Sequence, residues 1–383
     1  MSEFFKYQNL TWPEIAGLPR NTPLVIPLGE GYALERLGEA LGNPTRIGLL
    51  PAIPFGWVGS GLPVADHLLS AYLSNLMDSL REDGFSRVYA LTPQGLDLHL
   101  GVNRIALPVP DRLNPPPAFP SDEQRHKVLL FPIGHTEQHG FHLPMCTDTL
   151  IIEAIGRGVA QSIPDRAFAM PVMPYGVSMH RAAFAGTLNA GGRAFEDFWL
   201  GVLDALVGRG FTRFYLISGH GGNCSFLTNV VKYAGERHLN AFIATAWLYL
   251  SSPQGAEALQ AHRQSGSGGM GHACELETAF LLHLRPDLVH MERVVDETEF
   301  ISTPSYYMDW VEGGALVANP PWEDDTCTGA YGAGSLGSPH KGKIWLEAAI
   351  AETIGHVEEI HTQYSRRMSK RRELSQARSI SPV

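Results

Sequence analysis

The stretch PIGHTEQHGFHLPMCTD, residues 132–148, decides both the fold and the chemistry expected of this chain. It directly follows an apolar run, Val128 to Phe131, that is typical of a buried strand. Glu137 and His139 lie two residues apart, and a second carboxylate, Asp148, closes the stretch. Carboxylates and an imidazole in this pattern suit a borderline divalent cation such as zinc or manganese. Two carboxylates also allow one of them to bridge a pair of metals, an arrangement that generates hydroxide at neutral pH.

The composition is that of a globular protein with a substantial core, with 44% apolar and 18% charged residues. The net charge of -10 argues against a nucleic-acid partner. No run reaches the length of a membrane span, and the first residues do not resemble a signal peptide, so we expect a cytoplasmic protein without membrane contact. Cys146, Cys224, Cys274 and Cys327 form no CxxC pair. We interpret those beside the candidate site as small buried thiols rather than nucleophiles.

The chain contains an internal repeat. Strand-like and helix-like segments between residues 24 and 91 recur in the same order between residues 128 and 217. Their alternation predicts an α/β fold, a three-layer α/β/α domain with a mostly parallel sheet, preceded by a smaller degenerate copy of the same fold. The first copy has no Glu-Gln-His-Gly motif after its first strand, so we interpret it as a structural half without metal ligands.

These features divide the chain into four segments. Residues 1–105 form the degenerate half, and the proline-dense residues 106–122 form an extended linker. Residues 123–364 form the catalytic domain. Residues 365–383 are basic and polar, and we expect a disordered, solvated tail rather than a nucleic-acid arm, because the protein is acidic.

Two further segments carry chemistry. The sequence SGHGGN, residues 218–223, follows an apolar strand and presents His220 at the edge of the sheet where ligands gather in open α/β folds. The sequence GHACELET, residues 271–278, contributes His272 and Glu277 at the start of an apolar helix. Each segment is weak evidence alone, but together with residues 132–148 they predict one metal site.

These motifs resemble those of the creatininase (creatinine amidohydrolase) family, which includes a mycofactocin-system peptidase and a formamide hydrolase of archaeal flavin biosynthesis. The family pattern Pro-x-Gly-Ser-x-Glu-Gln-His-Gly-x-His-Leu-Pro, then Thr-Asp, corresponds to residues 132–148. Its Tyr-Gly, Phe-x-Gly-Thr, Asn-Gly-His and His-Ala-Gly-x-x-Glu-Thr segments correspond to residues 175–176, 184–187, 218–220 and 272–278. The resemblance runs in order from residue 122 to residue 360, and identifies a divergent member with a degenerate N-terminal repeat.

The resemblance implies a two-metal amide hydrolase. Asp148 would bridge one metal held by Glu137 and His220 and another held by His139. The second metal needs one more carboxylate, which in creatininase lies two residues after the histidine that matches His220. A glycine stands there in this chain, and Glu277 is the natural substitute. The cofactors implied are two divalent ions, zinc or manganese, with iron as a further option.

The resemblance also implies the catalytic and substrate-binding residues. His272 and Glu137 are the catalytic candidates, with His272 placed to protonate a leaving nitrogen. His142 either hydrogen-bonds a metal ligand or contacts the substrate, and His180 lies either near the pocket or on the surface. The substrate-binding candidates are His142, Tyr175, His180 and Asn223. Residues 253–271, Gly- and Ser-rich at their end, are expected to form a solvent loop or a lid.

We therefore expect a metal-dependent amidohydrolase that cleaves a C–N bond of a cyclic amide, a formamide or a related small molecule through a metal-activated hydroxide. One alternative is a creatininase-like peptidase acting on a modified peptide, and another is a non-catalytic metal-binding scaffold. Members that resemble creatininase form hexamers built from dimers, so we expect a homo-oligomer. In this chain the first half would occupy the place of a neighbouring subunit.

Overall fold

The computed structural model describes residues 2–100, 103–109, 119–178, 183–310 and 313–380. The strands are β1 (Glu3–Lys6), β2 (Leu24–Pro27), β3 (Arg46–Leu49), β4 (Val88–Pro93), β5 (Arg104–Leu107), β6 (Val128–Ile133), β7 (Ala167–Ala169), β8 (Arg213–Ser218), β9 (Phe242–Thr245), β10 (Met270–His272) and β11 (Tyr331–Gly332). The helices are α1 (Trp12–Ala16), α2 (Leu34–Ala40), α3 (Asp66–Glu82), α4 (Thr147–Ser162), α5 (Gly192–Gly208), α6 (Gly221–Arg237), α7 (Pro253–Gln260), α8 (Glu275–Leu284) and α9 (Pro339–Ile380).

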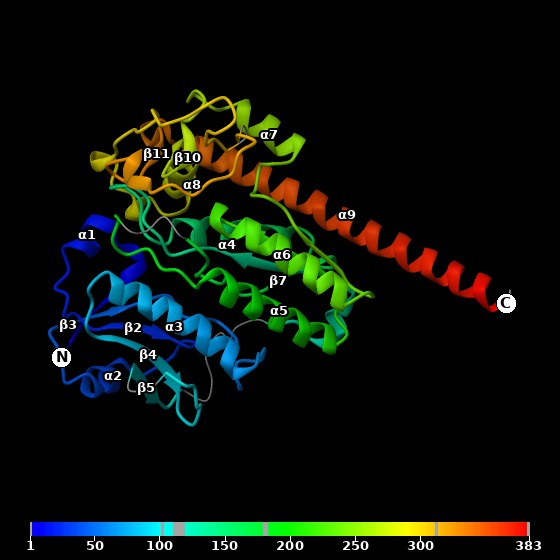
Figure 1. The fold of residues 1–383 in the computed structure, drawn as a ribbon, viewed down its shortest axis with the longest axis horizontal. Coiled ribbons are helices and arrows are strands. Elements are labelled where there is room, and N and C mark those ends of the chain that lie inside the picture. The colour runs from blue at the N-terminus through cyan, green and yellow to red at the C-terminus, as the bar shows by residue number, and fades with distance from the viewer. Residues whose placement is uncertain (1, 101–102, 110–118, 179–182, 311–312, 381–383) are drawn as a thin grey trace.

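Two parallel sheets organise the molecule, which confirms the predicted α/β class (Figure 1). The first has the order β1-β3-β2-β4-β5 and the second the order β7-β6-β8-β9. If β2 is matched with β6, β3 with β7, β4 with β8 and β5 with β9, the two orders are the same apart from β1. An isolated parallel β-bridge also lies at the carboxyl end of both β2 and β6. It joins Leu28 to Ile53 in the first half and Ile133 to Met173 in the second. This agreement supports duplication as the origin of the two halves.

The second sheet is the middle layer of an α/β/α arrangement because its strand residues alternate between two cores. Leu129, Phe131 and Phe214 pack into a core with α5 and α6. Leu130 and Ile217 point the other way, into a core with α4 and α9. The buried strands are therefore apolar on both faces, as a covered parallel sheet requires.

The two halves share one core through α3 and α5, which lie side by side between the sheets (Figure 1). Tyr72 of α3 packs on Phe198 of α5 with ring centroids 4.8 Å apart. The Tyr72 hydroxyl also donates a hydrogen bond to the Tyr175 carbonyl (2.8 Å) in the loop that approaches the candidate site. The first half therefore supports the second through buried contacts and not only through a linker.

The ends of the predicted segments differ from the structure in two places. Ala106 and Leu107, expected in the linker, belong to β5, and residues 110–118 of that linker lie outside the described residues. The tail from residue 365, expected to be disordered, continues α9 to Ile380. Strong helix formers fill this segment, and pairs such as Lys370 with Glu373 (3.5 Å) favour the helix.

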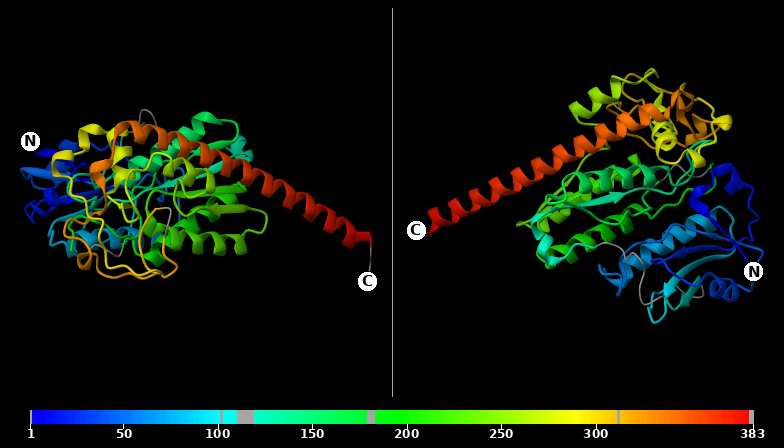
Figure 2. Two further views of the ribbon diagram at one scale, coloured as in Figure 1. Left: turned by 90° about the horizontal axis from the view of Figure 1, so that it is seen from above. Right: turned by 180° about the vertical axis from the view of Figure 1, so that it is seen from behind.

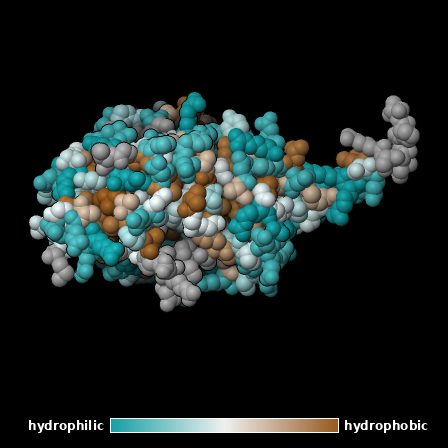
Figure 3. Space-filling model, turned by 90° about the horizontal axis from the view of Figure 1, so that it is seen from below, coloured by the Kyte–Doolittle hydropathy of each residue, from teal (hydrophilic) through white to brown (hydrophobic). Residues whose placement is uncertain are grey.

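Helix α9 projects from the body at its C-terminal end (Figure 2). Trp345, Val357 and Ile360 are buried, whereas the side chains of the projecting end are mainly exposed and hydrophilic (Figure 3). In the described part of the chain, no helix has both the length and the apolar character needed to cross a bilayer.

Candidate metal centre

The carboxyl ends of β6 and β8 define the site. In the sheet, β7 is the neighbour of β6 on one side and β8 is its neighbour on the other. Connections that leave β6 in opposite directions open a crevice at the carboxyl ends of β6 and β8. Residues 134–148 follow β6, and His220 follows β8 as the residue before α6. From the opposite side, β10 and the first turn of α8 bring in His272 and Glu277.

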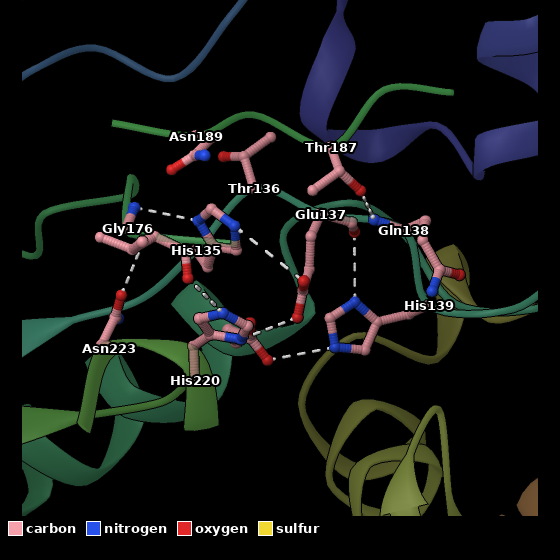
Figure 4. A network of polar contacts seen from close by, with 12 residues as sticks. His135, Thr136, Glu137, Gln138, His139, Gly176, Thr187, Asn189, His220 and Asn223 are labelled. Atoms are coloured by element: carbon pink, nitrogen blue, oxygen red, sulfur yellow. Dashed lines mark hydrogen bonds and ion pairs between the residues drawn. The ribbon is translucent and has the colours of Figure 1, made fainter. Parts of the chain in front are cut away.

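The five predicted ligands converge and are buried, and Figure 4 shows His139 and His220 on either side of Glu137. His220 Nδ1 lies 2.8 Å from Glu137 Oε1 and 3.4 Å from Asp148 Oδ2. His139 Nε2 lies 3.1 Å from Asp148 Oδ1 and 3.8 Å from Glu277 Oε1. The two oxygens of Asp148 thus face different histidines, which is the geometry of a carboxylate that bridges two cations.

Both ligand histidines are held in the tautomer that metal binding requires. His139 Nδ1 lies 3.2 Å from the Glu137 carbonyl oxygen, and His220 Nε2 lies 3.0 Å from the Val177 carbonyl oxygen. A ring nitrogen facing a carbonyl oxygen carries the hydrogen, so the other nitrogen turns its lone pair toward the carboxylates.

The carboxylate oxygens also indicate a missing cation. While His220 is unprotonated, the buried oxygens Glu137 Oε1 and Asp148 Oδ2 accept no hydrogen bond from any described residue. Buried anionic oxygens without donors are costly unless a cation neutralises them. The donor set of three carboxylates and two imidazoles therefore fits divalent zinc or manganese.

The histidines compensate for these charges when no metal is bound. Burial alone would lower the pKa of His220, but Glu137 and Asp148 raise it to about 10. Burial also opposes protonation of His139, yet Asp148 and Glu277 raise its pKa well above the ordinary value. Burial raises the pKa of Asp148, but His139 and His220 outweigh it and lower that pKa. The protons on the two histidines therefore occupy the place of a cation.

His272 differs from the ligand histidines because it is neutral. Burial and the neighbouring His139 lower its pKa to about 3. Its Nε2 lies 2.6 Å from the Gln138 carbonyl oxygen, which leaves the Nδ1 lone pair facing Glu137 Oε1 at 3.7 Å. His272 and Glu137, the two predicted catalytic residues, therefore lie together at the wall of the cavity.

His135 belongs to the site but was not predicted. The Gly176 N–H donates to His135 Nδ1 (2.9 Å), so the ring hydrogen is on Nε2, which lies 4.0 Å from Glu137 Oε2. A nitrogen that carries a hydrogen cannot bind a metal, so we interpret His135 as a neighbour of Glu137 and not as a ligand, although it lies within ligand distance (Figure 4). At 4.0 Å its Nε2 forms no hydrogen bond with Glu137, and it has no hydrogen-bond partner among the described residues. The available signal was a histidine at the position where the family pattern has serine.

The predicted substrate-binding residues do not line the cavity. His142 Nε2 lies 2.9 Å from the Thr278 hydroxyl, beside the ligand Glu277. The Tyr175 hydroxyl donates to the Pro51 carbonyl (2.6 Å), and Asn223 Oδ1 accepts from the Val177 N–H (2.9 Å). None of the three residues lines the cavity, so their contact with substrate stays a prediction, and for His142 the structure favours the alternative of a neighbour of a metal ligand. His180 lies outside the described residues.

The position of Gly222 has no room for a side chain. A Cβ at Gly222 would lie 2.4 Å from both His220 Nε2 and the Val177 carbonyl oxygen. No side chain fits there while the Val177 carbonyl accepts the hydrogen bond of His220. A carboxylate must therefore come from elsewhere, and Glu277 lies on the far side of His139.

The cysteines near the site are unsuited to nucleophilic catalysis. Burial raises the pKa of Cys146 and of Cys224 to about 12. Burial also raises the pKa of Cys274 well above its ordinary value. The three thiols therefore stay protonated, as expected for small buried side chains.

A cavity of about 640 Å³ lies over the ligands, and residues from the segments 300–310 and 313–319 supply much of its wall. Of residues 253–271, which were expected to form a loop or a lid, residues 253–260 form α7, residues 261–269 form a loop, and Gly271 of β10 lines the cavity. Arg263 makes a buried ion pair with Asp309 (2.6 Å), which anchors the wall segment to the body.

The comparisons with known proteins agree with this geometry. Residues 116–357 match the family model for creatininase, described as creatinine amidohydrolase. The creatinine amidohydrolase of Pseudomonas putida is 27% identical over 235 residues, which cover 58% of this chain and 85% of that protein. The mycofactocin precursor peptide peptidase of Mycobacterium ulcerans is 33% identical over 177 residues, which cover 43% of this chain and 62% of that protein. The match thus spans less than two thirds of the peptidase.

Solved structures show the same likeness. A manganese form of creatininase superposes with a TM-score of 0.52 at 25% identity, and the match covers 63% of this chain and 94% of that chain. A mutant creatininase of the Zn-Zn type superposes with a TM-score of 0.50 at 25% identity, covering 62% of this chain and 91% of that chain.

Proposed function

The chain belongs to the creatininase family, and from this premise we propose that it is a metal-dependent hydrolase that cleaves the C–N bond of an amide. The observation that carries the proposal is the position of Asp148, whose two oxygens lie 3.1 Å from His139 and 3.4 Å from His220. Buried carboxylates between two such histidines suit a binuclear centre. The ligands we assign are Glu137, His139, Asp148, His220 and Glu277.

Bound divalent metals lower the pKa of a coordinated water toward neutrality and polarise the carbonyl group that is attacked. The chain itself orients and moves protons around them. The carbonyls of Glu137 and Val177 hold the ligand histidines in their binding tautomers. His272, neutral and with Nδ1 facing the site, can take up a proton and deliver it to the leaving nitrogen. Glu137 Oε1 lies between the two rings, 2.8 Å from His220 Nδ1 and 3.7 Å from His272 Nδ1.

Manganese and zinc are the metals we propose, at two ions per chain, because the similar creatininase structures include a Mn form and a Zn-Zn form. The degenerate half, residues 1–105, is proposed to be structural. A peptidase acting on a modified peptide is the second candidate, and the similarity to a mycofactocin precursor peptide peptidase favours it.

Substitution of Asp148 by Asn tests the metal centre directly. Loss of the bridging charge should abolish both metal loading and amide hydrolysis, because each ion loses a ligand. Metal content is measured by plasma mass spectrometry after loading, with about two ions per chain expected for the unchanged protein. Asp287→Asn, at an exposed residue that pairs with Arg285, is the matched control and should retain both. Normal metal content and turnover in Asp148→Asn would contradict the assignment.

A further inference from the structure

The cavity extends well beyond the space around the five predicted metal ligands. Its volume of about 640 Å³ is that of pockets that enclose drug-sized ligands of a few hundred daltons. A small cyclic amide placed against the ligands would leave most of this space unfilled. The remaining volume must therefore be matched by a part of the substrate that does not react.

Aromatic rings form the wall of the cavity. Trp322 packs on the catalytic candidate His272 with centroids 4.8 Å apart, and on Tyr331 at 4.7 Å. Tyr331 stacks on Phe300 at 4.3 Å. Trp247 and Trp310 line the same cavity. The ring surface thus extends without interruption from the reacting end, and it favours contact with apolar or aromatic groups.

The wall offers no positive charge to a substrate. Apart from the predicted metal ligands, its carboxylates in the described chain are Asp309 and Asp325. Asp309 is paired with Arg263 and accepts from the Gly268 N–H (2.7 Å). Asp325 accepts from the Tyr331 hydroxyl and from the Ile301 N–H, both at 2.8 Å. No described lining residue is Lys or Arg, so an anionic substituent would find no partner there.

The mouth of the cavity is apolar and exposed. Four large apolar side chains at this mouth are more than half exposed: Trp247 (54%), Ile301 (70%), Leu316 (61%) and Val317 (97%). Exposed apolar side chains gathered around one opening mark a surface that is covered by a ligand. A substituent that fills the cavity would reach them.

From these features we propose that the substrate carries a bulky apolar or aromatic group, without an anionic substituent, attached to its scissile amide. This inference rests on the proposed hydrolase function and specifies its substrate class. Hydrolysis adds water across the C–N bond and releases a carboxylic acid and an amine. The bulky group lies against Trp322, Tyr331 and Phe300 while the amide lies at the metal ligands. Small polar amides bind weakly because they leave the wall uncovered.

Matched amides test the proposal on the manganese-loaded full chain. N-Methylacetamide is compared with N-(2-naphthyl)acetamide and with N-methyl-2-naphthamide, which place the ring on either side of the amide. Binding is followed by calorimetry and hydrolysis by chromatography of the products. At least one naphthyl compound should bind about tenfold or more tightly than N-methylacetamide, because it buries apolar surface. The sulfonated naphthyl analogue should lose that gain.

The possible results distinguish a failure of the hydrolase function from a failure of the proposed substrate class. Naphthyl binding without turnover of any amide supports the substrate-binding surface and overturns the hydrolase. Turnover of N-methylacetamide with no gain from the naphthyl group supports the hydrolase and overturns the substrate class. Preferred binding of the sulfonated analogue also overturns the substrate class, because the wall would then accept an anion.

A pair of exposed valines provides a matched control. Val317→Asp places a charge at the mouth and should reduce the preference for the naphthyl amide over N-methylacetamide by about tenfold, since the charge must be desolvated. Val58→Asp makes the same change at a residue that is 69% exposed and outside the cavity lining, and should leave the preference unchanged. An unchanged preference in Val317→Asp would contradict contact at the mouth.

Discussion

At the scale of single residues, the site is defined by which ring nitrogen of each histidine is engaged elsewhere. His139 and His220 use one nitrogen on a backbone carbonyl and turn the other toward carboxylates. His135 does the opposite, because its Nδ1 accepts the Gly176 N–H. Residues of the same type in one cluster therefore take different roles, and only the backbone partner distinguishes them.

His135→Ser tests this distinction. Because His135 lies beside Glu137 and we do not assign it as a ligand, the variant should still load metal to a near-normal level. Its kcat should fall by roughly tenfold, since Glu137 loses the buried ring that packs beside it at 4.0 Å. Metal content and steady-state kinetics are measured together. Loss of metal in the variant would show that His135 is a ligand after all.

Metal binding should depend on pH through the two ligand histidines. His220, with a pKa of about 10, and His139, with a raised pKa, are protonated at pH 7 in the metal-free protein and must lose their protons to bind a cation. The affinity should therefore fall as the pH falls, with about two protons released per chain at pH 7. Calorimetry in buffers of different ionisation enthalpy counts the protons. A pH-independent affinity would contradict this.

The raised pKa of His220 also determines whether the stability of the metal-free protein rises or falls with pH. The folded pKa of His220 lies above its unfolded value of about 6.5. Its contribution to the metal-free fold is therefore complete below pH 6.5 and is lost as the pH rises toward 10. Metal should offset that loss, so loaded and metal-free protein should differ most in Tm on the alkaline side.

At the scale of elements, the sequence predicted the site where motifs coincide with the ends of strands and the starts of helices. Asp148 and Glu277 lie in the first turns of α4 and α8, and His220 precedes α6, so short motifs fix their places. The cavity wall could not be predicted in this way. Residues 300–319 carry no repeating pattern, and tertiary packing alone brings Trp310 and Phe300 to the site.

The side-chain directions of the predicted substrate-binding residues could not be predicted from the motifs. Tyr175 and Asn223 lie in or next to segments that match the family pattern, but a motif does not tell whether a side chain points into the cavity or bonds to a backbone group elsewhere. Tyr175 turns to Pro51, a contact that no local pattern encodes. The helical end of α9 was missed because its polar composition suits both a solvated helix and a disordered tail.

The wall segment should depend on the buried pair of Arg263 and Asp309, whose side chains are 5% and 0% exposed. Asp309→Asn leaves a buried guanidinium without its charge partner and should cost about 3–5 kcal/mol of stability. Chemical denaturation measures the loss. The double variant Arg263→Met, Asp309→Leu removes both charges and should recover part of it. A double variant less stable than the single would contradict this account.

At the scale of the whole molecule, two halves with the same strand order share one core. The agreement of β3-β2-β4-β5 with β7-β6-β8-β9 favours duplication, and α3 packs on α5 where the two halves meet. The division into a structural half and a catalytic half stays a prediction.

The internal interface should reduce the number of chains in the assembly. If the first half takes the place of a neighbouring subunit, the full chain forms an oligomer of fewer than six copies, because part of each contact is already satisfied. Multi-angle light scattering of the metal-loaded protein gives the mass directly. A particle of six full chains would contradict the proposal.

Helix α9 should affect any sizing of the protein that relies on its elution volume and not on its mass. At about 1.5 Å per residue, its 42 residues extend roughly 63 Å, and its far end stands clear of the body. A rod of this kind increases hydrodynamic friction far more than it increases mass. The protein should therefore elute early from a sizing column, so that a column calibration against spheres would overstate the number of chains. It should also sediment slowly, and sedimentation read against spheres would understate that number.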